Sequence, residues 1–249
     1  TIIMESIILC GGLGTRMQNI NNNIPKSLLK IEEKPFLYWI IKQLQVNKIK
    51  KIILCLGIKH ELIMESINNF KFDNLEIEYF IEQEQLGTGG ALIKVINLIN
   101  SKNFIFMNGD SIFNIPIRNL YDMHVKNGNA LTYSLKKLEV QNTDYGGIDL
   151  WKDGQIRSHI MGESDSTNKM IDAGLRVINK QKILQFKKSL GVNKQNLSFE
   201  NEIAPELIKT NKVCGIEYDL DFFDIGNPQS YENTKSNFAK IKYKLECHE

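Results

Sequence analysis

Near its start the chain reads Ser6-Ile7-Ile8-Leu9-Cys10-Gly11-Gly12-Leu13-Gly14-Thr15-Arg16, in which an apolar run gives way to a glycine-rich loop. The continuous apolar character of Ser6–Cys10 is typical of a strand buried on both faces of a sheet. Glycines directly after such a strand let backbone N–H groups approach phosphate oxygens without obstruction by a Cβ atom. Arg16 adds a planar, always charged donor for the same oxygens. We therefore expect a phosphate-binding loop at the carboxyl end of the first strand.

Loop spacing and composition disfavour several classes of protein. The glycines match neither the dinucleotide-binding pattern GxGxxG nor the Walker pattern GxxxxGK[ST], which speaks against an NAD-dependent oxidoreductase and a P-loop protein. The 31 basic and 29 acidic residues give a formal charge of +2, which offers no case for a nucleic-acid partner. No apolar segment reaches membrane length, and the start of the chain lacks the features of a secretion signal. The cysteines Cys10, Cys55, Cys214 and Cys247 lack metal-ligand spacing, so we expect a reducing, cytoplasmic location.

Apolar runs of strand length alternate with segments of helical period along the first half of the chain. Strands are expected at Lys51–Leu56, Glu76–Ile81 and Asn103–Met107, and helices at Pro35–Val46, Glu61–Phe70 and Gly90–Ile99. In the second half we expect strands at Ala130–Leu138, Leu175–Ile178 and Val213–Tyr218, a hairpin at Asp149–Ile160, and helices at Gln181–Ser189, Glu200–Thr210 and Ser230–Leu245. This succession favours an α/β fold whose parallel sheet carries helices on both faces. Because no repeat or linker-like segment interrupts it, residues 1–249 are expected to form one domain.

Further motifs follow the glycine-rich loop. They are Ile24-Pro25-Lys26-Ser27-Leu28-Leu29, Leu86-Gly87-Thr88-Gly89-Gly90-Ala91, Asn108-Gly109-Asp110 and Phe223-Asp224-Ile225-Gly226-Asn227-Pro228. Together with the loop they resemble the signature of the sugar-1-phosphate nucleotidylyltransferases, in that family's order and over nearly the whole chain. The branch that the chain resembles most is the guanylyltransferases of D-glycero-D-manno-heptose 1-phosphate. The resemblance implies a Rossmann-like three-layer α/β fold with a mixed, mainly parallel sheet, and a transfer of a nucleoside monophosphate that releases pyrophosphate.

The resemblance also implies which residues serve the triphosphate. Arg16 would bind the β- and γ-phosphates of the leaving group, and Lys26 would reach the α-phosphate. Asp110 and Asp224 would hold Mg²⁺, a cation that takes hard oxygen ligands and only one or two protein carboxylates beside substrate phosphates. Each aspartate taken alone is as well explained by the capping of a turn, and it is their joint occurrence in two family motifs that favours the metal.

The nucleoside would lie against Leu9, Gly11, Gly12, Gly14, Thr15, Gly87 and Thr88. Five positions before Gly87, where the family often reads the base, the chain has Glu82. A carboxylate only accepts hydrogen bonds, which suits the N1–H and the exocyclic amine of guanine and opposes O4 of uracil or thymine. We therefore favour GTP, although Glu82 is also explained as a solvated charge at a strand end.

The sugar phosphate would contact Asn108, Tyr145, Gly146, Glu163 and Asp172. Two of these segments depart from the family pattern. Ser164 stands where many relatives have a lysine that holds the sugar phosphate, which leaves Lys169, Arg157 and Arg176 as candidate cations, each equally explained as a surface charge. Asp172 stands where an asparagine is common, so its side chain can accept hydrogen bonds but not donate them. Both departures favour a sugar other than plain glucose.

Two alternatives stay open at this point. A cytidylyl- or uridylyltransferase for another phosphorylated molecule would share the fold, and a non-catalytic nucleotide-sugar-binding subunit would be expected to lack Arg16, Lys26, Asp110 or Asp224, all of which this chain has. The sequence leaves open the oligomeric state, a homo-oligomer included. Because the chain ends soon after Asp224, we do not expect the left-handed β-helix of some relatives.

Overall fold

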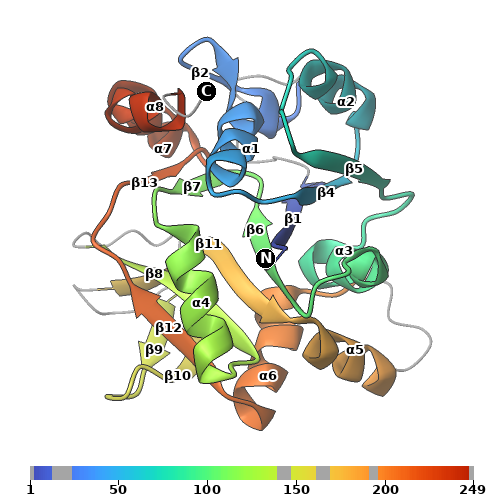
Figure 1. Cartoon of the computed structure of the whole chain (residues 1–249), viewed down its shortest axis with the longest axis vertical. Coiled ribbons are helices and arrows are strands. Elements are labelled where there is room, and N and C mark those ends of the chain that lie inside the picture. Colours follow the sequence, from blue (N-terminus) through green and yellow to red (C-terminus); the bar gives the residue numbers. More distant parts are fainter. Residues whose placement is uncertain (1–2, 13–23, 139–146, 161–168, 191–195, 247–249) are drawn as a thin grey trace. The chain divides into compact units, whose positions relative to one another are not determined.

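The computed structural model of the 249-residue chain describes residues 3–12, 24–138, 147–160, 169–190 and 196–246. The chain forms two compact units: unit 1 contains Thr1–Gln85, Met107–Asn114 and Asp221–Glu249, and unit 2 contains Leu86–Phe106 and Ile115–Leu220. The chain therefore passes between the units four times, and no single linker separates them. The single domain expected from the sequence stays a prediction. Figure 1 labels the elements of both units.

Unit 1 is built on parallel strands. Strand β1 (Glu5–Cys10) pairs with β4 (Lys51–Leu56), and β4 pairs with β5 (Glu76–Ile81), in a register that sets Ile7 opposite Ile53. Helix α1 (Phe36–Val46) leads into β4, and helix α2 (His60–Asn68) leads into β5 (Figure 1). The continuous apolar run of β1 and β4 is buried, as a parallel sheet covered by helices requires.

An aromatic cluster fixes the C-terminal segment of unit 1 on helix α1. The indole ring of Trp39 is fully buried, and its centroid lies 5.2 Å from that of Phe238, which ends helix α7 (Pro228–Asn237) and precedes α8 (Ala239–Glu246). The ring of Phe223 lies 5.2 Å from the same phenylalanine. Trp39 also donates a hydrogen bond from Nε1 to the carbonyl of Ile31, in the short hairpin of β2 (Lys30–Ile31) and β3 (Lys34–Pro35). This packing holds strand β13 (Phe222–Asp224) in place.

Unit 2 contains a mixed set of strands. Strand β11 (Lys169–Asn179) runs antiparallel to β8 (Leu131–Leu138) and β9 (Gly147–Leu150); β9 pairs with β10 (Ile156–Ile160), and β12 (Val213–Glu217) runs parallel to β8. Its helices are α3 (Gly87–Val95), α4 (Ile117–Asn127), α5 (Lys180–Ser189) and α6 (Ala204–Thr210), with short helical turns at Ile96–Leu98 and Phe199–Ile203. Strand β6 (Asn103–Asn108) contributes residues to both units.

The expected elements are present, and several bounds differ. The helix expected at Ser230–Leu245 is two helices, α7 and α8, that meet at the buried Phe238. The strand expected at Leu175–Ile178 is part of the longer β11, whose pairing with β8 is interrupted by a bulge. The short strand β7 (Ser111–Phe113), which pairs with β13, was not expected, because a run of three residues carries no readable periodicity.

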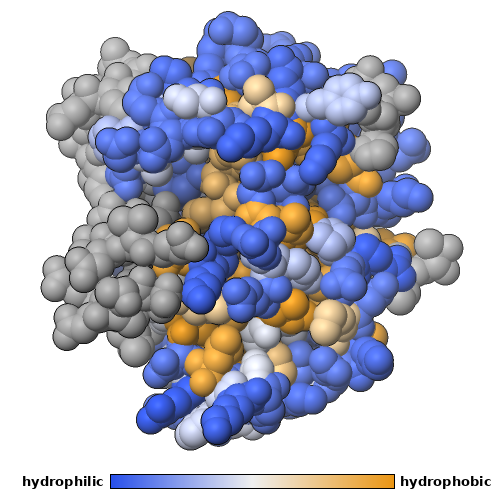
Figure 2. Space-filling view, turned by 90° about the vertical axis from the view of Figure 1, so that its left-hand side faces the viewer, coloured by the Kyte–Doolittle hydropathy of each residue, from blue (hydrophilic) through white to orange (hydrophobic). Residues whose placement is uncertain are grey.

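The face of the molecule in Figure 2 is mainly polar. On the face shown in Figure 2, hydrophilic residues predominate and apolar residues lie between them. The large apolar side chains that are most exposed, Ile3, Ile58, Trp151 and Tyr243, come from different segments of the chain. Such scattered exposure is ordinary for a globular protein. Among the described residues, no helix combines the length and the apolar character needed to cross a membrane.

Candidate active site

Two predicted site residues, Gly11 and Glu82, lie at the carboxyl ends of neighbouring strands of unit 1. Gly11 follows β1, Gly57 follows β4 and Glu82 follows β5. The strands are parallel, so these ends lie on one edge, where open α/β sheets bind ligands. The backbone N–H of Glu82 donates to the carbonyl of Leu56 at 2.8 Å, which extends the ladder into this edge.

Two of these ends approach each other closely at glycines. A Cβ atom on Gly11 would lie 2.5 Å from Oε1 of Glu82, and one on Gly57 would lie 2.6 Å from the carbonyl oxygen of Gly11. The half-buried carboxylate of Glu82 therefore lies directly against the backbone of the glycine-rich loop. A Cβ atom on Gly12 would meet no described atom within 4 Å, so that position is open.

The end of β6 contacts the end of β1. The N–H of Gly109 donates to the carbonyl of Leu9 at 2.9 Å, and a Cβ atom on Gly109 would lie 2.5 Å from Sγ of Cys10. Burial, reinforced by the carboxylate of Asp110, raises the pKa of Cys10 to about 12, so this thiol is protonated and a poor nucleophile at neutral pH. Asn108 is the half-buried last residue of β6.

Lys26 and Asp110 form an ion pair in unit 1. Lys26 begins a short helical turn directly after Pro25, and its Nζ donates to Oδ2 of Asp110 at 2.5 Å. The two side chains are 19% and 27% exposed, so both charges remain accessible to a ligand. The structure thus brings together two residues that lie 84 positions apart and that the sequence assigned to the phosphate and the metal.

Asp224 lies beside Asp110 because β13 pairs with β7. The antiparallel register sets Asp224 opposite Ser111, and the N–H of Ile225 donates to the carbonyl of Asp110 at 3.0 Å. Burial and the neighbouring charge of Asp110 raise the pKa of the Asp224 carboxyl, although hydrogen bonds from Gly226 and from the side chain of Ser230 oppose this. Two carboxylates that repel each other at one place are the oxygen ligands that a hard divalent cation needs.

Oδ1 of Asp224 is fixed by the start of helix α7. It accepts hydrogen bonds from the N–H of Gly226 and from Oγ of Ser230, both at 2.8 Å. Ser230 belongs to a capping box with Asn227, and its role as a partner of Asp224 was missed from the sequence. The signal was present, because Asn227-Pro228 followed by a serine at the third helical position is a helix-start pattern. In the part of the chain that the structure describes, no group of three or more His, Cys, Asp or Glu residues is arranged so that it could hold a metal ion.

Several predicted site residues lie outside the described residues: Gly14, Thr15, Arg16, Tyr145, Gly146 and Glu163. The side chain of Lys169, one candidate cation for the sugar phosphate, lies outside them as well. The assignments of all these residues stay predictions.

In unit 2, Gly87 and Thr88 begin helix α3. Gly87 has a φ of +73°, and a Cβ atom there would lie 2.6 Å from the carbonyl oxygen of Leu197, so both the backbone angle and the space require glycine. The hydroxyl of Thr88 donates to Oε2 of Glu200 at 2.7 Å and accepts from the N–H of Phe199 at 2.8 Å. Glu200 is thus a partner of a predicted nucleoside-binding residue, and nothing in the sequence beyond its charge pointed to this role.

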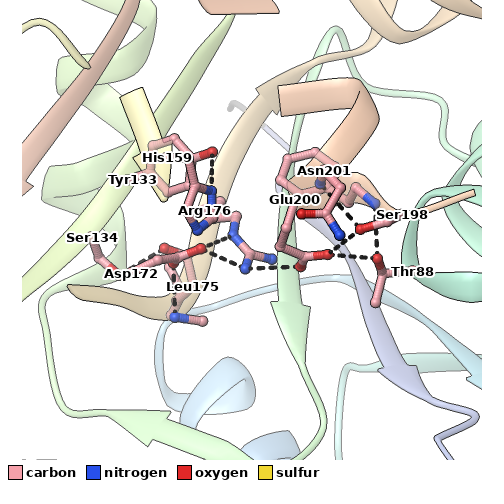
Figure 3. A network of polar contacts seen from close by, with 12 residues as sticks. Thr88, Tyr133, Ser134, His159, Asp172, Leu175, Arg176, Ser198, Glu200 and Asn201 are labelled. Carbon is pink, nitrogen blue, oxygen red and sulfur yellow. Dashed lines mark hydrogen bonds and ion pairs between the residues drawn. The ribbon is translucent and has the colours of Figure 1, made fainter. Parts of the chain in front are cut away.

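Asp172 is held by Arg176, as Figure 3 shows. Its Oδ2 accepts from Nε of Arg176 at 2.6 Å and lies 2.5 Å from Nη2, and its Oδ1 accepts from the N–H of Gly174 at 2.9 Å. Nη2 of Arg176 also lies 3.4 Å from Oε1 of Glu200. Arg176 is only 2% exposed, so its interpretation as a surface charge is wrong: desolvation pushes its pKa down, but the two carboxylates outweigh this and raise it.

The other candidate cation, Arg157, is exposed. Its guanidinium lies over the ring of Trp151, 5.0 Å from the centroid. Exposure agrees with its interpretation as a surface charge, and a role toward the sugar phosphate stays a prediction.

A parallel sheet with a glycine-rich loop, a lysine and two carboxylates beyond its strand ends defines a Rossmann-like, nucleotide-binding α/β protein. Comparison with known proteins specifies the class. The family described as Nucleotidyl transferase matches residues 5–240, and the chain belongs to this family. The resemblance inferred from the motifs and the α/β fold class with a mixed central sheet are both confirmed.

Individual relatives extend over nearly the whole chain. It is 33% identical to a D-glycero-alpha-D-manno-heptose 1-phosphate guanylyltransferase of Aneurinibacillus thermoaerophilus over 93% of this chain and 97% of that protein. It is 32% identical to the protein of that name from Campylobacter jejuni, over 92% and 97%. Among solved structures, the chain is similar to that of HddC from Yersinia pseudotuberculosis complexed with GMP-PN. The two sequences are 27% identical, and the match covers 95% of this chain and 100% of the HddC chain with a TM-score of 0.82.

Proposed function

We propose that this nucleotidyltransferase transfers a guanylyl group from GTP to a heptose 1-phosphate and releases pyrophosphate. The names of its relatives support both substrates. One observation of this structure carries the proposal: Lys26, Asp110 and Asp224, which come from three distant segments, meet in unit 1. This is the set of charges that a reaction at a phosphate needs.

The reaction requires little covalent chemistry from the protein. An oxygen of the sugar phosphate attacks the α-phosphorus of the triphosphate in line, the bond from that phosphorus to the bridging oxygen breaks, and pyrophosphate leaves. Positioning and the neutralisation of charge therefore account for most of the catalysis. Lys26 is proposed to neutralise the α-phosphate, and Arg16 the departing phosphates.

Asp110 and Asp224 fit Mg²⁺, because their oxygens are hard ligands and one or two carboxylates suffice beside phosphate oxygens. When bound, the cation would neutralise charge on the phosphates. The two carboxylates exceed the single charge of Lys26, so without a cation the cluster would repel a triphosphate. Lys26 donates one hydrogen bond to Asp110, and its ammonium group has two further N–H donors for a phosphate.

Glu82 supports the choice of guanine. Its carboxylate lies against the glycine-rich loop, where the base of a nucleotide on that loop would be within reach. Two acceptor oxygens match the N1–H and the exocyclic amine of guanine, whereas uracil and thymine present an acceptor there. Gly11, Gly12, Gly14, Leu9, Thr15, Gly87 and Thr88 are proposed to complete the nucleoside site, and Asn108, Tyr145, Gly146, Glu163 and Asp172 the sugar site.

The remaining predictions concern the cellular location, nucleic-acid binding and the oligomeric state. The described cysteines Cys10, Cys55 and Cys214 are free, which supports a cytoplasmic location. The near-neutral charge gives no support to a nucleic-acid partner. A homo-oligomer remains a prediction to be tested by the molecular mass in solution.

The test is a pyrophosphate-release assay with four nucleoside triphosphates against several sugar 1-phosphates in the presence of Mg²⁺. The proposal expects GTP with a heptose 1-phosphate to give the highest kcat/KM. A preference for UTP or CTP would refute the assignment of Glu82 and favour the uridylyl- or cytidylyltransferase. The absence of turnover with every pair would refute the enzymatic function and leave the non-catalytic subunit.

A second test is the variant Asp110→Asn, which keeps the size of the side chain and removes its charge. It should reduce kcat/KM by at least about 10- to 100-fold, because the loss of a residue that merely hydrogen-bonds to a metal ligand already has an effect of that size. Its unfolding transition should stay cooperative. Wild-type turnover in this variant would refute the metal role of Asp110.

A further inference from the structure

A buried chain of polar contacts in unit 2 links two segments that the proposed function assigns to different substrates. Thr88 belongs to the proposed nucleoside site and, with Gly87, forms what we call the nucleoside loop; its hydroxyl donates to Oε2 of Glu200 at 2.7 Å. The other oxygen of Glu200 lies 3.4 Å from Arg176. Arg176 in turn holds Asp172, which belongs to the proposed sugar site and marks what we call the sugar segment. Figure 3 shows the whole path, with Glu200 in its middle.

The fold makes the contact between Asp172 and Arg176 by an irregularity. On a regular strand, residues four apart are about 13 Å apart and cannot form an ion pair. In β11, the four residue steps from Asp172 to Arg176 face only two steps on β8, from Leu135 to Tyr133. The extra length is absorbed at Gly174, whose φ is +78°. The bulge thus shortens the distance along β11, and the side chain of Arg176 reaches back to Asp172 on the same strand. Bulges often lie next to functional sites.

Arg176 is also fixed on its apolar sides. Its guanidinium carbon lies 5.0 Å from the ring centroid of Phe199, 5.6 Å from that of Phe106 and 6.0 Å from that of Tyr133. The side chains of Arg176, Asp172 and Glu200 are 3%, 6% and 14% exposed. A guanidinium enclosed in this way cannot turn away from either carboxylate without losing its packing, so the positions of Asp172 and Glu200 depend on each other.

We infer that Arg176 and Glu200 are positioning residues that couple the two substrate sites: occupation of the nucleoside loop fixes the sugar segment in its binding shape, and the reverse. The inference rests on the proposed function, since it takes Thr88 and Asp172 from its two sites. Arg176 itself is enclosed by protein carboxylates and acts through them. Coupling of this kind is reciprocal and commonly changes affinity by about 5- to 150-fold.

Glu200→Gln is the sharpest perturbation. The carboxylate of Glu200 accepts from Thr88 with one oxygen and faces Arg176 with the other. An amide keeps the volume of the side chain and can still exchange a hydrogen bond with the Thr88 hydroxyl, which both donates and accepts. It removes the negative charge that faces Arg176, so the substitution weakens the link to the guanidinium and leaves the side chain in place. Arg176→Lys is the second variant, because it keeps the charge and loses the fork that holds Asp172 and Glu200 together.

The measurement is the KM for the sugar 1-phosphate at limiting and at saturating GTP, and the ratio of the two values reports the coupling. We expect a ratio of about 5 or more in the wild type and of less than about 2 in both variants, with both KM values raised more than kcat is lowered. Thr132→Val is the matched control: it removes a fully buried hydroxyl from a separate polar network of unit 2, with His124 and Asn129. It should lower Tm and keep the wild-type ratio.

Three results would overturn the inference. They are a wild-type ratio near 1, a ratio unchanged in an active Glu200→Gln or Arg176→Lys enzyme, and an equal loss of coupling in Thr132→Val, which would show a general effect of destabilisation. Each of these leaves turnover, and therefore the proposed function, intact. Absence of turnover in the wild type with every substrate pair would remove the proposed function and this inference with it.

Discussion

The close contact between Gly11 and Glu82 gives a prediction about base preference. In Gly11→Ala the new Cβ would lie 2.5 Å from Oε1 and 3.1 Å from Cδ of Glu82. Ordinary contact begins at about 3.5 Å, so the carboxylate has to move by about 1 Å. The atoms that must move are at the end of a flexible side chain, and the φ of Gly11 is not in the left-handed region. The fold should therefore survive the substitution.

The cost should fall on the nucleotide. A hydrogen bond of about 2.9 Å that lengthens by about 1 Å is no longer a hydrogen bond. A bond to a charged group contributes about 1.5–3 kcal/mol, so the loss of one should reduce the preference for GTP over UTP by about 10- to 150-fold in kcat/KM. The assay is the pyrophosphate-release panel with both triphosphates, together with thermal unfolding of each protein.

Gly12→Ala is the matched control, because its Cβ would meet no described atom within 4 Å. If both glycines lie against the phosphates, Gly12→Ala raises the KM for every triphosphate alike and leaves the ratio of GTP to UTP unchanged. The reasoning about Glu82 fails if the two variants change the ratio equally, or if Gly11→Ala keeps the wild-type ratio.

Further predictions concern the metal, the lysine and pH. Lys26→Met should tighten Mn²⁺ binding to the nucleotide-free protein by about 5- to 30-fold, measured by calorimetry. The substitution removes a half-buried ion pair of about 1–2 kcal/mol and so frees the carboxylate of Asp110 for the cation. An unchanged affinity would contradict competition between the lysine and the cation at that carboxylate. Burial lowers the pKa of His124 to about 4, from 6.5 in an unfolded chain. The unfolded state therefore binds the proton at a higher pH than the folded state does, and the free energy of unfolding falls as the pH drops from about 6.5 to about 4. The loss should reach about 3 kcal/mol near pH 4 in urea titrations. His124→Gln should flatten that dependence, and an equally steep curve in the variant would exclude the imidazole as its source.

The sequence predicted the parts of the fold that depend on long apolar runs. Strands β1, β4 and β5 were expected with their observed bounds or within one residue: β1 and β4 from short continuous apolar runs, and β5 from the alternation of charged and apolar residues at its start. The ladder of β7 and β13 could not be predicted in the same way. Each strand has three residues, and their pairing is decided by the aromatic packing of Phe223 and Phe238, which is visible only in three dimensions.

The same limit applies to the candidate site. Lys26, Asp110 and Asp224 were found by motif, since residue type and order are readable along a chain. The partners Ser230 and Glu200 were not, because each contributes through a contact that the fold creates. Arg176 shows the difference most clearly. A single arginine in the expected strand Leu175–Ile178 is as well explained as a surface charge, and only the bulge in β11 brings it against Asp172 inside the unit.

The two charged clusters have the same surplus of one carboxylate and differ in access to solvent. In unit 1, Lys26 and Asp110 are 19% and 27% exposed, so an incoming cation can replace the lysine on Asp110 and the lysine can move to a phosphate. In unit 2, Arg176 and Asp172 are 3% and 6% exposed, and separating them would leave a buried charge unpaired, which costs about 3–5 kcal/mol. Exchange is therefore open to the first cluster and closed to the second. A cluster whose partners exchange can take part in each turnover, whereas one whose partners cannot separate is suited to hold the shape of a binding segment. This difference in exposure is the physical reason to assign phosphate and metal chemistry to Lys26, Asp110 and Asp224, and positioning to Arg176 and Glu200.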